Sequence, residues 1–309
     1  MNVALNGSVV QADQAVISPY DHGFLYGIGL FETFRTYGGR PYLLDRHLDR
    51  LAAGCRDLGI RYVPDAGRLQ ALLDELLRSN GLDDAYVRLT VSAGDEGLGL
   101  PAGDYGRPNE VVMVKALPAQ DPQLYESGRE LRLLRTRRNS PEGDIRLKSL
   151  HYMNNILAKR ELAASGAPPG SEGLLLDRDG RLAEGIVSNL FFVPAAVCAE
   201  ARRRVCTPAV STGILPGITR GRVLELAAEA GYETEEGLYG WDDLLAAEEI
   251  WLTGSVQELV PVTRLSNPGG GGAVIVGDGT AGTVTLELLR AYRSDIRAMT
   301  AADGEEDRP

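Results

Sequence analysis

Alternating apolar and polar residues near the start of the chain predict two hairpins. The first has apolar strands on either side of Asn6-Gly7, a dipeptide that readily adopts the left-handed dihedral angles of a two-residue turn. The second joins residues 30–37 to residues 40–44 through Gly38-Gly39. Together they indicate that the chain begins in an antiparallel sheet.

Two helices and two more strands follow in the predicted order. Residues 45–58 and 65–79 place apolar side chains at helical spacing. The first segment ends before Gly59 and the second before Asn80-Gly81. Residues 85–92 and 110–117 alternate with the period of two that a half-buried strand shows. We therefore expect a small N-terminal α/β domain that combines one sheet with two helices.

The second half of the chain alternates predicted strands and helices. Prolines and polar residues at 118–128 indicate a linker, so the expected domains are 1–117 and a larger one at 129–299, followed by a polar tail at 300–309. The predicted elements after the linker are strands at 131–136, 173–177, 189–193 and 249–253, and helices after Asn154, at 218–230 and at 283–294. The expected fold class is therefore α+β or α/β.

Composition and charge exclude several classes of function. The chain has 309 residues and a net charge of −11, which argues against a nucleic acid as partner because such proteins present a basic face. The sequence has no apolar run of about 18 residues, and its N-terminus lacks a basic region before an apolar one. The three cysteines form no CxxC pair and indicate a reducing compartment. We expect no membrane span, no export, no metal site and a cytoplasmic location.

One lysine and one acid carry the candidate chemistry of the chain. Only Lys115, Lys148 and Lys159 are lysines among 32 basic residues, and the first and third of these fit exposed surface positions. Lys148 stands just before a predicted helix. An amine kept partly unprotonated by burial or by a cationic neighbour can form a Schiff base with pyridoxal phosphate. Glu184, at a predicted strand end, would face the pyridine nitrogen and favour its protonated, electron-accepting form.

Two turns and one arginine are candidates for holding the phosphate of such a cofactor. The run Leu215-Pro216-Gly217-Ile218-Thr219-Arg220 leads directly into a predicted helix, whose first amide groups and dipole favour an anion. Thr253-Gly254-Ser255 follows a predicted strand and offers small hydroxyl groups with close approach to the backbone. Arg50 would add a bidentate donor. Taken alone, the helix start and the arginine also fit an ordinary helix cap and a surface charge.

Four sequence signatures give the chain a resemblance to a known family. They are KSLHYMNNILAKRE, AEGIVSNLFF, GILPGITR and TGSVQELVPV. In this order and spacing they resemble the fold type IV pyridoxal phosphate enzymes, which include branched-chain aminotransferases, D-amino-acid aminotransferases and aminodeoxychorismate lyases. The resemblance extends from Val3 to about Tyr292. It implies a homodimer whose active sites lie between a small and a large domain and are edged by the partner chain.

The resemblance implies a role for each candidate residue of the cofactor site. Lys148 would form the Schiff base and transfer protons, and Glu184 would pair with the pyridine nitrogen. Tyr152 would hydrogen-bond the hydroxyl of the cofactor ring. The residues that would hold the phosphate are Arg50, Ile218, Thr219 and Ser255.

The substrate side of the site separates the members of the family. The run SPYDHGFLYGIGLFETFRTY resembles bacterial aminodeoxychorismate lyases, and in it Thr33 replaces the glycine of branched-chain aminotransferases and is expected to relay a proton. Tyr86 and Arg88 match the substrate pocket of those aminotransferases, and Tyr26 is expected beside the same substrate. We therefore expect a lyase that forms 4-aminobenzoate and pyruvate for folate synthesis. An aminotransferase for branched-chain or D-amino acids is the alternative, and a non-catalytic protein is disfavoured by the intact lysine and glutamate.

Overall fold

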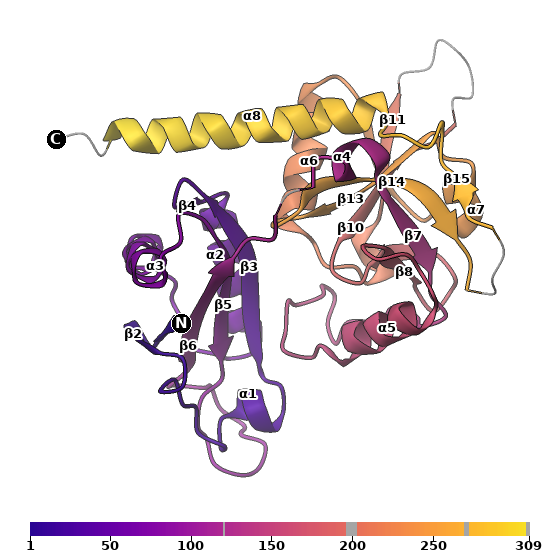
Figure 1. Cartoon of the computed structure of the whole chain (residues 1–309). Helices are drawn as coiled ribbons and strands as arrows, with labels where there is room; N and C mark the ends of the chain where they lie inside the picture. Colours follow the sequence, from indigo (N-terminus) through magenta and orange to yellow (C-terminus); the bar gives the residue numbers. More distant parts are fainter. Residues whose placement is uncertain (120, 196–202, 269–271, 307–309) are drawn as a thin grey trace. The chain divides into compact units, whose positions relative to one another are not determined.

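The chain forms two compact units. The computed structural model describes residues 1–119, 121–195, 203–268 and 272–306 (Figure 1). The first unit contains Met1–Ala119, Leu147–His151 and the chain from Ile296 onward, and the second contains Gln120–Arg146 and Tyr152–Asp295. Within the described ranges, no helix is long and apolar enough to cross a membrane, and no group of His, Cys, Asp and Glu side chains could hold a metal ion.

A six-stranded sheet forms the centre of the first unit, in the order β2-β1-β6-β5-β3-β4. Every pairing in this sheet is antiparallel. Its strands are β1 (Asn2–Leu5), β2 (Ser8–Gln11), β3 (Gly29–Tyr37), β4 (Arg40–Pro41), β5 (Ala85–Ser92) and β6 (Asn109–Ala116). Because successive side chains of a strand point to opposite sides, β3 and β5 each contribute to two different faces.

Helices α2 (Leu44–Asp57) and α3 (Ala66–Asn80) pack on one face of this sheet. Their buried leucines form a single core with strand residues such as Phe34, Val87 and Leu89, all of which are nearly inaccessible to solvent. Burial of this apolar surface is the main stabilising contribution to the unit. The side chains at alternate positions of β3 and β5 therefore project to the face away from the two helices.

Most strands and helices of the first unit begin and end at the predicted turn and capping residues. Asn6 and Gly7 have φ angles of 51° and 82°, so the first hairpin has the expected left-handed turn. Gly81 ends α3 with a φ of 66°, a conformation that glycine adopts without strain. The predicted strand at 40–44 is too long. Leu43 takes a left-handed φ of 56°, and the chain enters α2 at Leu44.

A nine-stranded mixed sheet forms the second unit, in the order β12-β11-β10-β13-β14-β7-β8-β9 with β15 paired to β14. Strands β9 and β10 also contact each other although they are far apart in this order, so the sheet curls. Its strands are β7 (Arg129–Leu133), β8 (Glu172–Leu176), β9 (Leu182–Gly185), β10 (Asn189–Val193), β11 (Arg204–Pro208), β12 (Glu233–Gly237), β13 (Glu249–Gly254), β14 (Glu258–Ser266) and β15 (Val274–Ile275).

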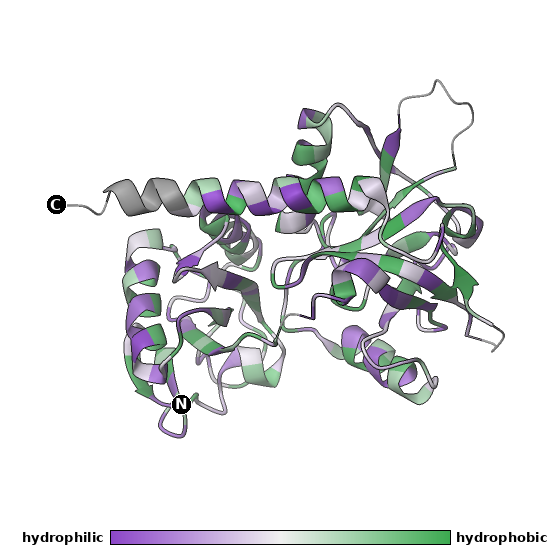
Figure 2. Cartoon of the chain, turned by 45° about the horizontal axis from the view of Figure 1, so that its top comes forward, coloured by the Kyte–Doolittle hydropathy of each residue, from purple (hydrophilic) through white to green (hydrophobic). Residues whose placement is uncertain are grey.

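The helices of the rest of the chain differ in length and in burial. They are α4 (Leu124–Ser127), α5 (Met153–Ala164), the 3-10 helix η1 (Val210–Thr212), α6 (Ile218–Glu229), α7 (Trp241–Leu245) and α8 (Thr283–Glu306). Figure 2 shows bands of hydrophobic and hydrophilic residues alternating along α8. Its buried residues Val284, Leu288 and Tyr292 recur every four positions, as expected for one buried face of a helix.

Two segments that were predicted to be irregular form helices instead. The predicted linker at 118–128 contains α4, a single turn that is too short to show a hydrophobic period. The predicted tail at 300–309 continues α8 as far as Glu306, and residues 307–309 lie outside the described part. Extending an existing helix costs less than starting one, so a polar segment rich in alanine can continue it.

Candidate active site

The segment around Lys148 is bound to the first part of β3. Phe31 N donates to the Lys148 carbonyl at 2.9 Å, and Leu150 N donates to the Gly29 carbonyl at 3.0 Å. Lys148 is partly buried, and its Nζ lies 4.7 Å from the centre of the Phe31 ring. The backbone therefore fixes the base of this side chain, and its amine lies against the ring of Phe31.

Three more of the predicted residues share the face of the sheet that carries Phe31. Thr33 pairs directly with Arg88 across β3 and β5, and Tyr86 stands two positions before Arg88. Directly paired residues of antiparallel strands project to the same side, as do alternate residues of one strand. The Arg88 guanidinium carbon lies 3.6 Å from the centre of the Phe31 ring. The first unit thus carries Thr33, Tyr86 and Arg88 on the face where Lys148 meets Phe31.

Tyr26 follows the short helix α1 (His22–Leu25) and contacts two neighbouring segments. Its hydroxyl accepts a hydrogen bond from Gly99 N at 3.1 Å, and its carbonyl lies 3.0 Å from His151 Nε2. The side chain is 36% exposed. Tyr26 therefore ties the loop after β5 to the segment of Lys148, and its contact with substrate stays a prediction.

The opposite side of β3 carries a buried charge cluster. Glu32 accepts hydrogen bonds from Arg50 Nε at 2.8 Å, from Arg50 Nη2 at 2.7 Å and from His47 Nδ1 at 2.7 Å. Burial raises the pKa of Glu32, but Arg50 and His47 outweigh burial and lower this pKa to about 2. Burial lowers the pKa of His47, and the charge of Lys148 acts in the same direction. A neutral His47 therefore donates its Nδ1 proton to Glu32, and Glu32 in turn orients Arg50.

The substitution Glu32→Gln should destabilise the protein by about 3 kcal/mol near neutral pH, because it leaves the partly buried Arg50 and the buried His47 without their anionic acceptor. The pKa of Glu32 is lowered from 4.5 to about 2 in the folded protein. Its contribution to stability is therefore complete above about pH 4.5 and is lost as the pH falls toward about 2. Urea unfolding of both proteins across this range measures the difference.

A surface acid provides the control for this prediction. Glu225 is 41% exposed and pairs with Arg222 at 2.9 Å. The substitution Glu225→Gln should cost less than about 1 kcal/mol, because exposed ion pairs contribute little. Equal losses for the two variants would contradict the importance assigned to the cluster of Glu32, His47 and Arg50.

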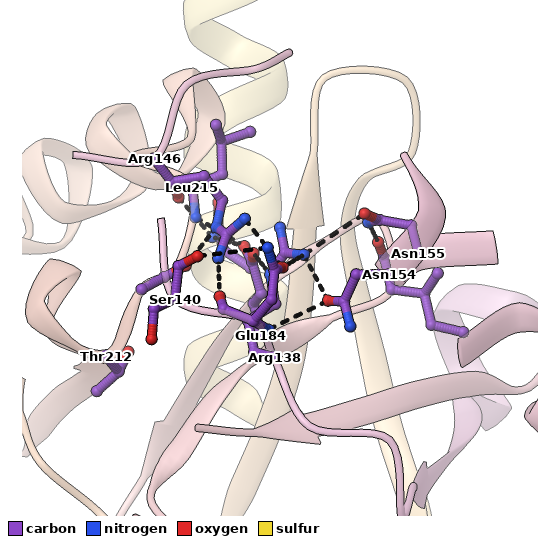
Figure 3. Close-up of polar contacts among 12 residues, drawn as sticks. Arg138, Ser140, Arg146, Asn154, Asn155, Glu184, Thr212 and Leu215 are labelled. Atoms are coloured by element: carbon purple, nitrogen blue, oxygen red, sulfur yellow. Dashed lines mark hydrogen bonds and ion pairs between the residues drawn. The ribbon is translucent and has the colours of Figure 1, made fainter. Parts of the chain in front are cut away.

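Glu184 lies on β9 and is only 5% exposed. Its Oε1 accepts from Arg138 Nε at 2.7 Å, and its Oε2 accepts from Asn189 Nδ2 at 3.1 Å and from Leu215 N at 3.0 Å (Figure 3). A carboxylate offers about four acceptor positions, and these bonds to described residues occupy three of them. A fixed anion with a further acceptor position on Oε1 fits the N–H of a protonated pyridine ring.

Two of the predicted phosphate ligands lie side by side in the second unit. Thr219 Oγ1 and Ser255 Oγ are 3.2 Å apart, and Ile218 is the first residue of α6. In the part of the chain that the structure describes, no side chain caps this helix, and the buried Thr253 Oγ1 has no hydrogen-bond partner. Hydroxyl groups beside an uncapped helix N-terminus are suited to an anion. This donor set therefore fits the predicted phosphate.

The predicted site residues are divided between the two units. Those in the first unit are Tyr26, Thr33, Arg50, Tyr86, Arg88 and Lys148, and those in the second are Tyr152, Glu184, Ile218, Thr219 and Ser255. That the Lys148 amine and the Glu184 carboxylate face one cofactor ring stays a prediction. The contact of Tyr152 with the ring hydroxyl stays a prediction as well.

Sequence reasoning missed the residues that hold these charges in place. Arg138 belongs to the basic run at 135–138, which has the composition of a surface cluster. Asn189 begins a buried strand, where an amide gives no signal of its partner. Only Glu32 could have been noticed in the sequence. It stands at an inward position of a predicted strand, and a buried carboxylate must have a charged or hydrogen-bonding partner.

Comparison with known proteins places this geometry in a family. Residues 29–265 match the family described as Amino-transferase class IV. The chain is also 40% identical over 304 residues to aminodeoxychorismate lyase of Bacillus subtilis (strain 168), and the match covers 98% of this chain and 97% of that relative.

Solved structures of related enzymes have the same fold. The 4-amino-4-deoxychorismate lyase from Pseudomonas aeruginosa has a TM-score of 0.78 and 28% identity, covering 95% of this chain and 98% of that one. The T.th. branched-chain amino acid aminotransferase, solved with pyridoxamine 5'-phosphate, has a TM-score of 0.80 and 28% identity, covering 96% and 93%. These matches confirm the predicted fold type IV architecture and the prediction of an enzyme. The chain therefore belongs to the class IV aminotransferase family.

Proposed function

We propose that the protein is an aminodeoxychorismate lyase, which converts 4-amino-4-deoxychorismate to 4-aminobenzoate and pyruvate in folate synthesis. The observation that carries this proposal is the position of Thr33 on the strand face where Lys148 meets Phe31. A hydroxyl at this position adds a proton-transfer group that a glycine would lack. The similarity to the Bacillus subtilis lyase along nearly the whole chain supports the same assignment.

The cofactor proposed for this site is pyridoxal 5'-phosphate. It would supply an aldehyde that binds an amine and a ring that accepts electron density. Glu184 would receive the N–H of the ring nitrogen, and Tyr152 would hydrogen-bond the ring hydroxyl. The residues proposed to hold the phosphate are Arg50, Ile218, Thr219 and Ser255, of which Thr219 and Ser255 already lie within hydrogen-bonding distance of each other.

The side chains of this chain would divide the proton transfers between them. Lys148 would remove the proton from the substrate carbon that bears the amine. Glu184 would keep a positive charge on the ring nitrogen while negative charge develops on the substrate. Thr33 would relay a proton to the departing enolpyruvyl group, whose loss as pyruvate makes the substrate ring aromatic.

Amino-group transfer to a keto acid is the second candidate function, for branched-chain or D-amino acids. Tyr86 and Arg88 favour it, because they resemble the substrate pocket of branched-chain aminotransferases and stand on the strand face that carries Thr33. The similarity to the T.th. aminotransferase supports this alternative as well. The same lysine would serve both reactions.

Product analysis separates the two functions. The purified protein should form 4-aminobenzoate and pyruvate in equal amounts from aminodeoxychorismate, without an added keto acid. Parallel incubations with a branched-chain or D-amino acid and a keto acid test for amino-group transfer. Absence of 4-aminobenzoate would overturn the lyase assignment, and transamination in the same preparation would then support the alternative.

The substitution Thr33→Gly should lower the lyase kcat by about 100-fold and affect any transamination much less, because it removes the proposed proton relay. Thr33→Ser keeps the hydroxyl and should retain most of the activity. Melting temperatures control for the loss of stability, since glycine within a strand costs about 0.5–1 kcal/mol. Equal losses in the two reactions would remove the reason for preferring the lyase.

We infer further that the enzyme works as a homodimer in the cytoplasm. Phe24 is 77% exposed, and Leu98 and Leu100, in the loop that Tyr26 contacts, are 77% and 85% exposed. Large apolar side chains that are exposed on the surface favour a protein interface.

The cysteines support the proposed cytoplasmic location. The free thiols of Cys55 and Cys206 fit a reducing compartment.

A further inference from the structure

Arg138 approaches Glu184 from a segment that is anchored to the sheet of the second unit. Its side chain is 7% exposed, and its Nε donates to Glu184 Oε1 at 2.7 Å (Figure 3). Its backbone N donates at 2.8 Å to the carbonyl of Leu176, the last residue of β8. Both the main chain and the charged end of Arg138 are therefore fixed within this unit.

The beginning of α5 holds the other side of the same guanidinium group. Arg138 Nη1 donates to Asn154 Oδ1 at 2.8 Å and lies 3.4 Å from Asn155 Oδ1. Asn154 Nδ2 donates to the Arg137 carbonyl, and Asn155 Nδ2 donates to the Ile186 carbonyl. An amide whose oxygen and nitrogen are both engaged cannot turn over without losing hydrogen bonds. The two asparagines thus form a rigid frame that directs Arg138 toward Glu184.

A second buried cation stands near this pair. Arg146 donates to the Asn139 and Gly213 carbonyls. Burial lowers the pKa of Arg146 to about 10, the charge of Arg138 adds to this shift, and Glu184 opposes it. Two buried like charges require an anion near them, and Glu184 is the carboxylate that Arg138 contacts.

The free-energy cost of burying the charges of Arg138 and Glu184 indicates a role other than stability. A buried ion pair contributes little compared with apolar residues that fill the same volume. The hydrogen bonds to Glu184 nevertheless converge from Arg138, Asn189 and Leu215 on one carboxylate. These hydrogen bonds hold the Glu184 carboxylate in one position and one orientation.

We propose that Arg138 is a positioning residue for the reaction, which holds the Glu184 carboxylate in place and directed at the ring nitrogen of the cofactor. Asn154 and Asn155 in turn keep Arg138 in place. This inference rests on the proposed function, because it requires pyridoxal phosphate in the site. In this role Arg138 acts through Glu184, which it contacts directly.

The test measures the protonation of the cofactor's ring nitrogen. Wild-type protein, Arg138→Gln and Arg138→Lys are each loaded with pyridoxal 5'-phosphate that carries 15N in the ring, and the 15N chemical shift reports protonation. Wild type and Arg138→Lys should show a protonated nitrogen, because both keep a cation beside Glu184. Arg138→Gln should show an unprotonated nitrogen. Its kcat should fall about tenfold to hundredfold with a much smaller change in KM.

A second arginine of the same unit provides the matched control. Arg132 is partly buried and pairs with Glu130 at 3.2 Å. Arg132→Gln should lower the melting temperature but keep the protonated nitrogen and the wild-type kcat. A protonated nitrogen in Arg138→Gln, or the same loss of kcat in Arg132→Gln, would overturn the role of Arg138. A wild-type protein that binds none of the labelled cofactor would instead overturn the proposed function, and this role with it.

A milder variant keeps the test available if Arg138→Gln does not fold. Asn154→Ala leaves the charges of Arg138 and Glu184 in place but removes one acceptor that holds the guanidinium. Its kcat should fall about threefold to tenfold, a smaller loss than in Arg138→Gln because the charge beside Glu184 stays in place. Wild-type kcat in a folded Asn154→Ala protein would contradict the proposed frame.

Discussion

Replacing Lys148 with alanine should abolish formation of 4-aminobenzoate and any amino-group transfer, with a loss in kcat of at least about 1,000-fold. The reason is that one amine would both bind the cofactor covalently and accept the substrate proton. The arginines of the site cannot replace it, because a guanidinium stays protonated. Borohydride reduction followed by mass spectrometry should find the cofactor on the peptide that contains Lys148 in the wild type and on no peptide of the variant.

The two other lysines are the controls for this experiment. Lys159 is exposed on α5, and Lys115 is exposed with its Nζ 4.5 Å from the centre of the Tyr86 ring. Replacing either with alanine should leave both activity and labelling intact. Cofactor found on Lys115 or Lys159 in the wild type, or full activity in Lys148→Ala, would refute the assignment of the catalytic lysine.

The first unit was predictable because its signals are local. The hairpin at Asn6-Gly7 depends on two dihedral angles that this dipeptide adopts easily. Helix α3 depends on a cap at Asp65 and on a left-handed Gly81, both of which stand in the sequence beside a regular apolar period. Each of these choices is decided within a few residues, so no tertiary contact had to be known.

The second unit was less predictable because its sheet depends on distant pairings. Strand β12 is a run of mostly acidic residues that pairs in parallel with β11, and neither has the alternation of a typical half-buried strand. Strand β14 is buried along almost its whole length, but only residues 259–262 form an apolar run, which is too short to identify a strand by its period. Tertiary contacts decide such segments, and the sequence pattern alone does not contain them.

The site shows the same division between local and distant information. That Thr33 lies on the opposite side of β3 from Glu32 follows from the alternation of a strand. That Thr33 stands directly opposite Arg88 required the register of β3 and β5. The partners of Glu184 could not be predicted from the sequence. Arg138 lies 46 positions away in the chain, and its basic run is typical of an exposed loop.

The substitution Glu184→Gln should lower kcat by about 100-fold to 1,000-fold, the effect of removing one directed electrostatic contact from an active site. Glutamine keeps the volume of Glu184 but loses its negative charge, so the ring nitrogen would no longer be held protonated. Its amide also has only one acceptor oxygen for donors that now reach both carboxylate oxygens, from Arg138 on one side and Asn189 on the other. Steady-state kinetics and the melting temperature separate the loss of charge from the loss of structure.

A neighbouring buried acid distinguishes these two causes. Glu172 lies on β8, which pairs with β9, and burial raises the pKa of its carboxyl. It accepts hydrogen bonds from Gly173 N and Ile186 N. The substitution Glu172→Gln therefore changes a buried acid of the same sheet while leaving the charge of Glu184 unchanged, and kcat should stay within about threefold of wild type. If Glu172→Gln lowered kcat as much as Glu184→Gln, the loss of activity would come from a change in the sheet. The comparison of the two variants would then give no support to the assignment of Glu184 to the ring nitrogen.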